Sequence, residues 1–274
     1  LIGHEARAGF DLAQGPLLRA SLLILDPEEF VLLFTIHQTV WDGWSFRVFY
    51  RELEVLYDAV ASGRIAALPE LPLQYAGYAV WQREECRGER LDSEISFWRQ
   101  RLSQGSRQLL LPTDHPRPPR QTYLGVRRSV VLSDSLNKGL KELSRRQDTT
   151  LFMTLLAAFI TLLHRYSGQA EIVVGCPVAN RHFPEIENSI GSFVNTLALN
   201  TTITGNSSFT ELLSEVRSLC LAAFAHQEFP FERLVEDLQP ERNLNQNPLF
   251  QIFFAFQNTA PAGLSLPGLY TEPI

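Results

Sequence analysis

The first forty residues alternate between apolar runs and polar turns in a pattern that predicts a β-hairpin. Mostly apolar residues occupy positions 17–25 and 30–36, and the polar turn 26–29 separates the two runs. An earlier turn is expected at Gly15-Pro16, before the first run. Two strand-length apolar runs joined by a short polar turn favour antiparallel pairing.

From Ser45 the spacing of apolar residues changes from that of a strand to that of a helix. The positions that recur at intervals of three and four are Phe46, Phe49, Leu53, Leu56 and Val60. This period indicates an amphipathic helix, which Gly63 ends. Two further helical segments are predicted over residues 75–87 and 91–102.

Residues 103–124 have a different character, with four prolines among scattered polar residues. Proline removes backbone donors and disfavours both helix and sheet, so this stretch predicts a linker. The chain therefore divides into three parts: the latter part of an N-terminal lobe (1–102), an inter-lobe linker (103–124), and a C-terminal lobe (125–274), incomplete at its C-terminus.

The third part mixes strand and helix signals. Strands are predicted over 126–132, 172–174, 193–200 and 249–256, and helices around 136–143 and over 151–166, 209–224 and 231–238. Ser208 and Glu211 form a capping box before one of these helices, and Pro230 occupies a position that a first helical turn tolerates. Mixed strands and helices in two lobes, without an internal repeat, predict an α/β sandwich.

Composition narrows the class of protein. Lysines and arginines number 24 against 30 acidic residues, a net charge of −6 that argues against nucleic acid or an anionic membrane as a partner. The longest apolar stretch, 151–163, is too short to span a bilayer. Three dispersed cysteines show no metal-ligand spacing and fit a reducing cytoplasm. The only methionine is Met153, so we expect an internal stretch of a longer protein.

Five segments carry the candidate chemistry. In order, they are FTIHQTVWDGWS (34–45), YAGYAVW (75–81), IGSFVNT (190–196), HQEFPFE (226–232) and RNLNQNPL (242–249). The first resembles the His-His-x-x-x-Asp-Gly signature of the condensation domains of nonribosomal peptide synthetases. The other four resemble later segments of that family and stand in the family's order. Because two upstream family motifs have no match, the resemblance implies an N-terminally truncated first lobe.

The resemblance implies a fold and a reaction. The fold is a V-shaped, two-lobed sandwich similar to chloramphenicol acetyltransferase, with a partial first lobe and the active site in the tunnel between the lobes. Donor and acceptor peptidyl carrier domains would present phosphopantetheine thioesters in trans, with no cofactor bound by the domain itself. The acceptor amine would attack the donor thioester and form a peptide bond. An adenylation domain is expected in the same polypeptide.

The resemblance also assigns roles to the residues of the first segment. The second histidine of the signature is the family's candidate base, but here Gln38 takes its place, and an amide cannot act as a base near neutral pH. His37 is expected to support the loop, and Asp42 to hold it by pairing with an arginine, for which Arg181 is a candidate. Gly43 is expected to need a backbone angle that a side chain would forbid.

Three more residues are candidates for the substrate channel: Trp44, Ser45 and Asn195. For Trp44, packing is the competing explanation. Asn195 is a polar residue within a predicted strand, so ordinary bonding between strand and loop competes with a role facing the channel. The loop 175–189 resembles the family segment that floors the channel, and a plain surface loop is the alternative.

Several functional classes stay open because of Gln38. Either Gln38 orients the amine and the domain works by positioning, or the domain is catalytically silent and docks carrier proteins or recruits a partner enzyme. An introduced His→Gln substitution is a third explanation.

Epimerisation domains keep the second histidine, and heterocyclisation domains replace the first by aspartate, so neither fits. A free-standing acyltransferase of the same fold is also open. Gly77 and Glu228 each stand where the family segments have an aspartate, and these two differences are expected to have little effect on function.

Overall fold

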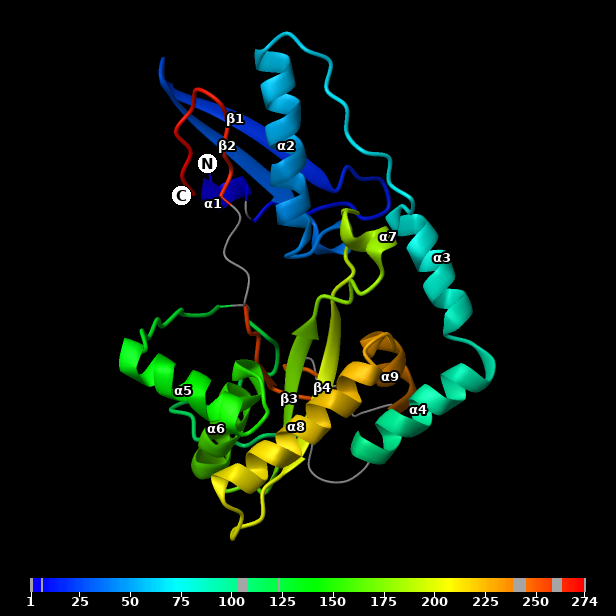
Figure 1. The fold of residues 1–274 in the computed structure, drawn as a ribbon, viewed down its shortest axis with the longest axis vertical. Helices are drawn as coiled ribbons and strands as arrows, with labels where there is room; N and C mark the ends of the chain where they lie inside the picture. The colour runs from blue at the N-terminus through cyan, green and yellow to red at the C-terminus, as the bar shows by residue number, and fades with distance from the viewer. Residues whose placement is uncertain are drawn as a thin grey trace. The chain divides into compact units, whose positions relative to one another are not determined.

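The polypeptide forms two compact units (Figure 1). The computed structural model describes residues 2–5, 7–102, 108–122, 124–238, 245–257 and 263–273. Unit 1 takes the described residues of Leu1–Glu84, Ala179–Val194 and Thr259–Ile274, and unit 2 takes those of Glu85–Val178 and Asn195–Asn258. The mixed α/β class predicted from the sequence is confirmed. The V-shaped arrangement of lobes stays a prediction of the resemblance.

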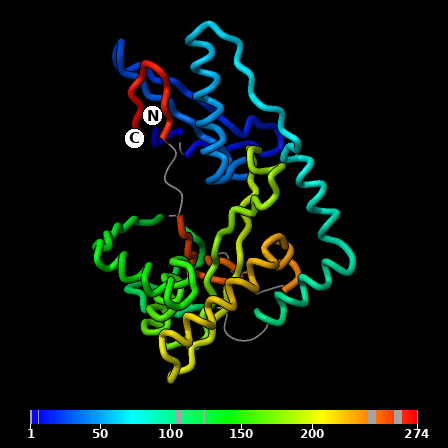
Figure 2. The backbone as a smooth tube through the Cα atoms, in the orientation of Figure 1, coloured from blue at the N-terminus to red at the C-terminus, as the bar shows by residue number. Residues whose placement is uncertain are grey.

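Unit 1 contains the predicted hairpin. Strands β1 (Leu18–Asp26) and β2 (Glu29–Ile36) pair antiparallel, with Leu22 opposite Leu32. Helix α2 (Ser45–Ala61) runs alongside the hairpin (Figure 2), where the Phe34 and Phe49 rings meet edge-on at 5.0 Å. The short helix α1 (Ile2–Glu5) is joined to β1 by an ion pair between Glu5 and Arg19. The hairpin and helix predictions are confirmed, and together they fix the turn between β2 and α2.

A second group of elements in unit 1 surrounds that turn. These are the 3-10 helix η1 (Gln38–Val40), α3 (Tyr75–Glu85) and α7 (Pro184–Glu187). Tyr78, Ile186 and Phe193 form a small buried cluster among them. Residues more than a hundred positions apart in sequence therefore pack together next to the motif 34–45.

Unit 2 is built on a three-stranded sheet in the order β4-β3-β5. Strand β3 (Glu171–Val178) is antiparallel to β4 (Asn195–Thr202) and parallel to β5 (Ile252–Phe253). The helices of this unit are α4 (Gly88–Leu102), α5 (Asp134–Arg146), α6 (Leu151–Ser167), α8 (Phe209–Ala225) and α9 (Phe231–Leu238). Burial of the strands against α6 and α8 forms the main hydrophobic core.

Local signals explain where several helices begin and end. The predicted capping box is present at α8, since the Ser208 hydroxyl accepts from the Glu211 N–H and the Glu211 carboxylate accepts from the Ser208 N–H. The hydrogen bonds that the Glu211 carboxylate accepts from the Ser208 N–H and from the Ser208 hydroxyl lower the pKa of Glu211. Helix α6 ends at Gly168, whose φ of +70° is a left-handed angle that glycine adopts without strain.

Two strand predictions in the C-terminal part need correction. The segment 126–132 is not a strand: Val126, Val130 and Val131 are more than four-fifths exposed. Its apolar composition favours a strand, but a strand also needs a hydrogen-bonded neighbour, and no strand of the described ranges pairs with this segment. The strand predicted over 249–256 is reduced to Ile252–Phe253.

The predicted linker is confirmed only in its lack of regular structure. Residues 108–122 form neither helix nor strand, while 103–107 and 123 lie outside the described residues. The first compact unit ends at Glu84, well before the lobe boundary predicted at residue 102. Helix α4 belongs to unit 2, because its residues Trp98 and Leu102 are buried in the core of that unit. The lobe boundaries at 102 and 125 thus stay predictions from the proline-containing composition of residues 103–124.

The helices also bear on the question of a membrane span. No single helix of the described ranges is long and apolar enough to cross a membrane, although α5 and α6 meet that criterion as a pair bent by 105°. Within the same ranges, no group of three or more His, Cys, Asp or Glu side chains could hold a metal ion.

The cysteines give a first testable prediction. All three are free thiols, and burial raises the pKa of Cys176 and Cys220 to about 12 and also raises that of Cys86. Since the thiolate is the reactive form, we expect Cys176 and Cys220 to resist alkylation at a pH of about 8 in the folded protein. Mass spectrometry after iodoacetamide treatment should show both unmodified, and all three modified in denaturant. Rapid modification of Cys176 or Cys220 in the folded protein would contradict this burial.

Candidate functional site

The chain turns directly after β2, and His37 caps that turn. The His37 Nδ1 accepts a hydrogen bond from the Thr39 N–H at 3.2 Å and lies 2.8 Å from Thr39 Oγ1. Because Nδ1 accepts, a neutral His37 carries its proton on Nε2. His37 therefore supports the 3-10 helix η1, as the resemblance implied.

Gln38 is the first residue of η1, and its side chain is exposed. No hydrogen bond of this side chain is found within the described ranges of the chain. Its amide therefore has a carbonyl acceptor and an NH₂ donor that a ligand can engage. The position predicted to be reactive is thus accessible, but it offers hydrogen bonds instead of a base.

The buried carboxylate of Asp42 holds the turn in place. Both of its oxygens accept from Arg181 Nη2, each at 3.0 Å, and the two side chains are 3% and 1% exposed. Asp42 Oδ1 also accepts from the Ser45 N–H and Oγ, and Oδ2 accepts from the Phe193 N–H. The predicted pairing of Asp42 with Arg181 is confirmed.

Arg181 connects this carboxylate to the loop 179–194. Its Nη1 donates to the backbone oxygens of Ile186 and Ser189 at 2.9 and 2.6 Å, and its guanidinium stacks on the Phe193 ring at 4.1 Å. Burial lowers the pKa of Arg181, while the charge of Asp42 opposes that shift. A guanidinium so deeply buried is stable only with such partners, so Asp42 and Arg181 form one unit of structure, here called the Asp42–Arg181 clamp.

Asn180 fixes the backbone of the loop 179–194 next to Arg181. This structural role was not predicted from the sequence. It is buried and adopts a φ of +54°, a left-handed conformation that asparagine tolerates better than most residues. Its Nδ2 donates to the Tyr78 hydroxyl at 3.0 Å. The signal in the sequence was the Asn-Arg pair within a proline-containing loop, but its partner on α3 is 102 positions away.

Gly43, Trp44 and Ser45 complete the turn. The prediction for Gly43 was wrong: its φ is not in the left-handed region and a Cβ there would meet no atom within 4 Å. Trp44 donates its indole N–H to the Glu187 backbone oxygen at 2.9 Å. Ser45 is fully buried, and its Oγ bridges Asp42 and the Gly191 backbone. Both side chains thus bind the loop 179–194.

Asn195 belongs to unit 2, at the start of β4. Its Nδ2 donates to the backbone oxygens of Gln227 and Phe229 at 2.8 and 2.7 Å, and its Oδ1 accepts from the Thr196 and Phe231 N–H groups. These four bonds use the full capacity of the amide donors and engage the acceptor twice. The geometry favours the explanation that Asn195 anchors the strand to the loop before α9.

The protein is thus of the α/β class, and in unit 1 its turn at His37-Gln38 is held by the buried pair Asp42 and Arg181. A protein-family model described as Condensation domain matches residues 1–265. The chain belongs to the condensation-domain family.

Relatives of the chain are found among peptide synthetases. It is 47% identical over 270 residues to one of the linear gramicidin synthase subunits of Brevibacillus parabrevis, a match that covers 98% of this chain and 4% of that protein. It is 43% identical over 258 residues to the phosphinothricin tripeptide synthetase PhsC of Streptomyces viridochromogenes, covering 94% of this chain and 24% of that protein. The chain thus spans a small part of the length of these curated relatives.

Solved structures share the fold. The X-domain from teicoplanin biosynthesis superposes with a TM-score of 0.86 at 27% identity, covering 91% of this chain and 57% of that one. The X-domain in a complex with OxyB matches with a TM-score of 0.84 at 28% identity, covering 92% of this chain and 56% of that one. The chain spans just over half of the X-domain.

Proposed function

We propose that the chain is the part of a condensation domain that holds the reacting amine during peptide-bond formation between two carrier-bound thioesters. The observation that supports this most is the Asp42–Arg181 clamp, which fixes the turn that presents Gln38. The relatives named as a gramicidin synthase and a tripeptide synthetase support the same reaction class.

In the proposed reaction, the acceptor amine nitrogen attacks the thioester carbon of the donor. The new C–N bond forms, the C–S bond breaks, and the donor's sulfur leaves as a thiolate with the electron pair. The Gln38 carbonyl accepts a hydrogen bond from the amine and aligns its lone pair with the thioester. The proton from nitrogen passes to the departing thiolate or to water, because an amide cannot take it. Alignment of this kind can lower a barrier by about 7–11 kcal/mol.

A second candidate function is recruitment without catalysis. It is favoured by Gln38 at the position of the expected base and by the match to an X-domain that was solved in a complex with OxyB. In this case the chain would dock a carrier or a partner enzyme, and the clamp would serve only to keep the turn folded.

A condensation assay separates the two. The longest natural polypeptide that contains this chain is supplied with donor and acceptor carriers loaded with aminoacyl thioesters, and dipeptidyl carrier is followed by mass spectrometry. We expect dipeptide formation that needs both carriers. Absence of dipeptide, while the loaded carriers still bind, would contradict the catalytic proposal and favour recruitment.

A further inference from the structure

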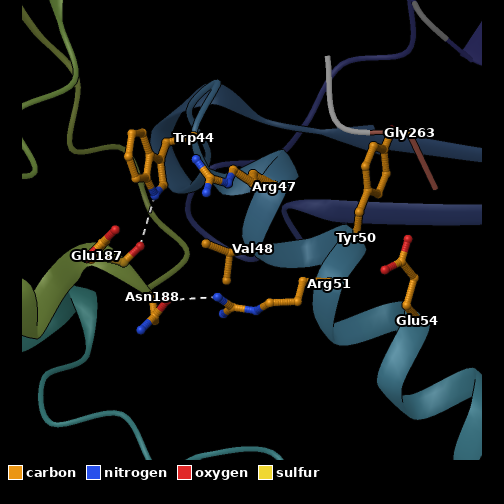
Figure 3. Close-up of a pocket in the computed structure, with 9 residues that line it drawn as sticks. All are labelled: Trp44, Arg47, Val48, Tyr50, Arg51, Glu54, Glu187, Asn188 and Gly263. Carbon is orange, nitrogen blue, oxygen red and sulfur yellow. Dashed lines mark hydrogen bonds between the residues drawn. The ribbon is translucent and has the colours of Figure 1, made fainter. Parts of the chain in front are cut away.

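The first residues of the turn that presents Gln38 have a support that the Asp42–Arg181 clamp does not supply. The clamp, together with the bond from the Trp44 indole to the Glu187 backbone oxygen, holds residues 42–45 (Figure 3). His37 and Gln38 come earlier in the turn. Their support comes from the segment of unit 1 that precedes β1.

The Phe10 ring restrains the His37 imidazole. The two rings meet in a T-shaped contact, with their centres 5.7 Å apart and their planes at 74°, an arrangement that ring pairs favour. The His37 N–H donates to the Leu17 backbone oxygen at 2.9 Å. Backbone and ring of His37 are thus both tied to the segment before β1. This restraint keeps Nδ1 within reach of the Thr39 N–H, the bond that caps η1.

Phe10 lies in a stretch that is neither helix nor strand, and Arg19 of β1 holds this stretch in place. Arg19 Nε pairs with the Glu5 carboxylate at 2.5 Å, while Nη1 and Nη2 donate to the backbone oxygens of Gly9 and Ala8 at 3.1 and 3.0 Å. The Arg19 guanidinium carbon lies 3.9 Å from the centre of the Phe10 ring. One side chain therefore fixes both the backbone before Phe10 and the ring itself.

These contacts need a guanidinium, and a positive charge alone would not provide them. A guanidinium presents its N–H donors in a fixed planar fork and stacks on aromatic rings, whereas a lysine ammonium is a point charge on a flexible stem. Arg19 spreads its fork over acceptors of Glu5, Ala8 and Gly9. A lysine at this position could keep the ion pair with Glu5 but not the fork.

We propose that Arg19 is a positioning residue for peptide-bond formation. Acting through Phe10 and His37, it fixes where Gln38 is presented to the acceptor amine. This role rests on the proposed function, in which Gln38 orients that amine. Arg19 and Phe10 contribute no atom to the reaction, so their loss displaces Gln38 without removing a hydrogen-bonding group from the site.

Single-turnover condensation at increasing concentrations of the loaded acceptor carrier tests this role in the longest natural polypeptide that contains the chain. We expect R19M and F10L each to lower the rate at saturating carrier about tenfold, because a misplacement of about 1 Å can cost about 10²-fold. The carrier concentration that gives half of the maximal rate should not change. R64M is the matched control, since Arg64 lies in the same unit and has an exposed ion pair with Asp58.

Further variants separate geometry from charge. R19K keeps the positive charge but loses the fork, so it should be nearly as slow as R19M. E5Q keeps an acceptor for Arg19 Nε and removes the negative charge, and its rate should stay within about twofold of that of the unaltered protein, because partly exposed ion pairs contribute little. The double variant R19M/F10L should be no slower than F10L, because Arg19 acts through Phe10.

Hydrogen exchange followed by mass spectrometry reports on the turn without relying on catalysis. The N–H groups of residues 39–41 bond to His37 and Gln38, so peptides that cover them should exchange faster in R19M but not in R64M. Peptides of β3 should exchange at the same rate in every variant, since a local displacement of the turn leaves unit 2 folded.

Several outcomes would overturn the proposal. These are unchanged condensation rates in both R19M and F10L, or full activity in R19K, which would show that charge alone suffices. A higher half-saturating carrier concentration with an unaltered maximal rate would assign Arg19 to carrier binding instead. If the unaltered protein forms no dipeptide, the proposed function fails, and hydrogen exchange then decides separately whether Arg19 places the turn: equal exchange of residues 39–41 in R19M and in the unaltered protein would show that it does not.

Discussion

Gln38→His is expected to raise the rate of peptide-bond formation about 10²–10⁴-fold, the usual contribution of a positioned general base. The substitution restores an imidazole at the position where the family signature has its second histidine. The measurement is a single-turnover assay of dipeptide formation with both carriers loaded. A base with a pKa near about 6.5 should also make the rate rise with pH through that region, while the protein with Gln38 should show no such step.

Gln38→Leu is the matched control for that experiment. It keeps a side chain of similar size and removes both hydrogen-bonding groups of the amide. If Gln38 orients the amine, Gln38→Leu should be slower than the unaltered protein. Equal rates for the unaltered protein and both of its variants would show that residue 38 takes no part in the reaction, and the proposed mechanism would then be wrong.

Arg181→Gln is expected to lower the free energy of unfolding by about 3–5 kcal/mol, because it leaves the Asp42 carboxylate buried without its counter-charge. It also removes the donors to the Ile186 and Ser189 backbone oxygens. The measurement is urea denaturation followed by circular dichroism. Arg217→Gln is the control, since its ion pair with Asp148 is exposed and such pairs contribute about 0–1 kcal/mol.

A double-mutant cycle with Asp42→Asn makes this prediction specific. Once the carboxylate is neutral, loss of Arg181 should cost less than it does beside a charged Asp42. Costs that simply add would show that the two side chains act independently, contrary to the geometry of the clamp. Peptide-bond formation should fall in both single variants, because the turn that presents Gln38 loses its support.

Much of unit 1 could be predicted from the sequence because its signals are local. The apolar runs 17–25 and 30–36 predict β1 and β2. The spacing of apolar residues by three and four positions after Ser45 predicts α2. The pairing of Asp42 with Arg181 came from the resemblance, since no local pattern joins residues 139 positions apart.

The errors arise where structure depends on distant partners. Residues 126–132 have the composition of a strand, but the outcome depends on a neighbouring strand that composition does not reveal. Gly43 was expected to need a backbone angle that a side chain would forbid, whereas its φ lies outside the left-handed region. Asn180 does adopt a left-handed angle, and its side chain donates to the hydroxyl of Tyr78, a partner 102 positions away that no local pattern reveals.

The clamp also sets an order of events during synthesis. Asp42 leaves the ribosome 139 residues before Arg181 does, a delay on the order of ten seconds at ordinary rates of translation. Until then the nascent carboxylate must stay hydrated, so the motif-bearing segment completes its folding only after the intervening part of unit 2 has been translated. For the same reason, a recombination junction placed anywhere between these two positions would unite an aspartate and an arginine from different parents, and the compatibility of their surroundings would decide whether the hybrid folds.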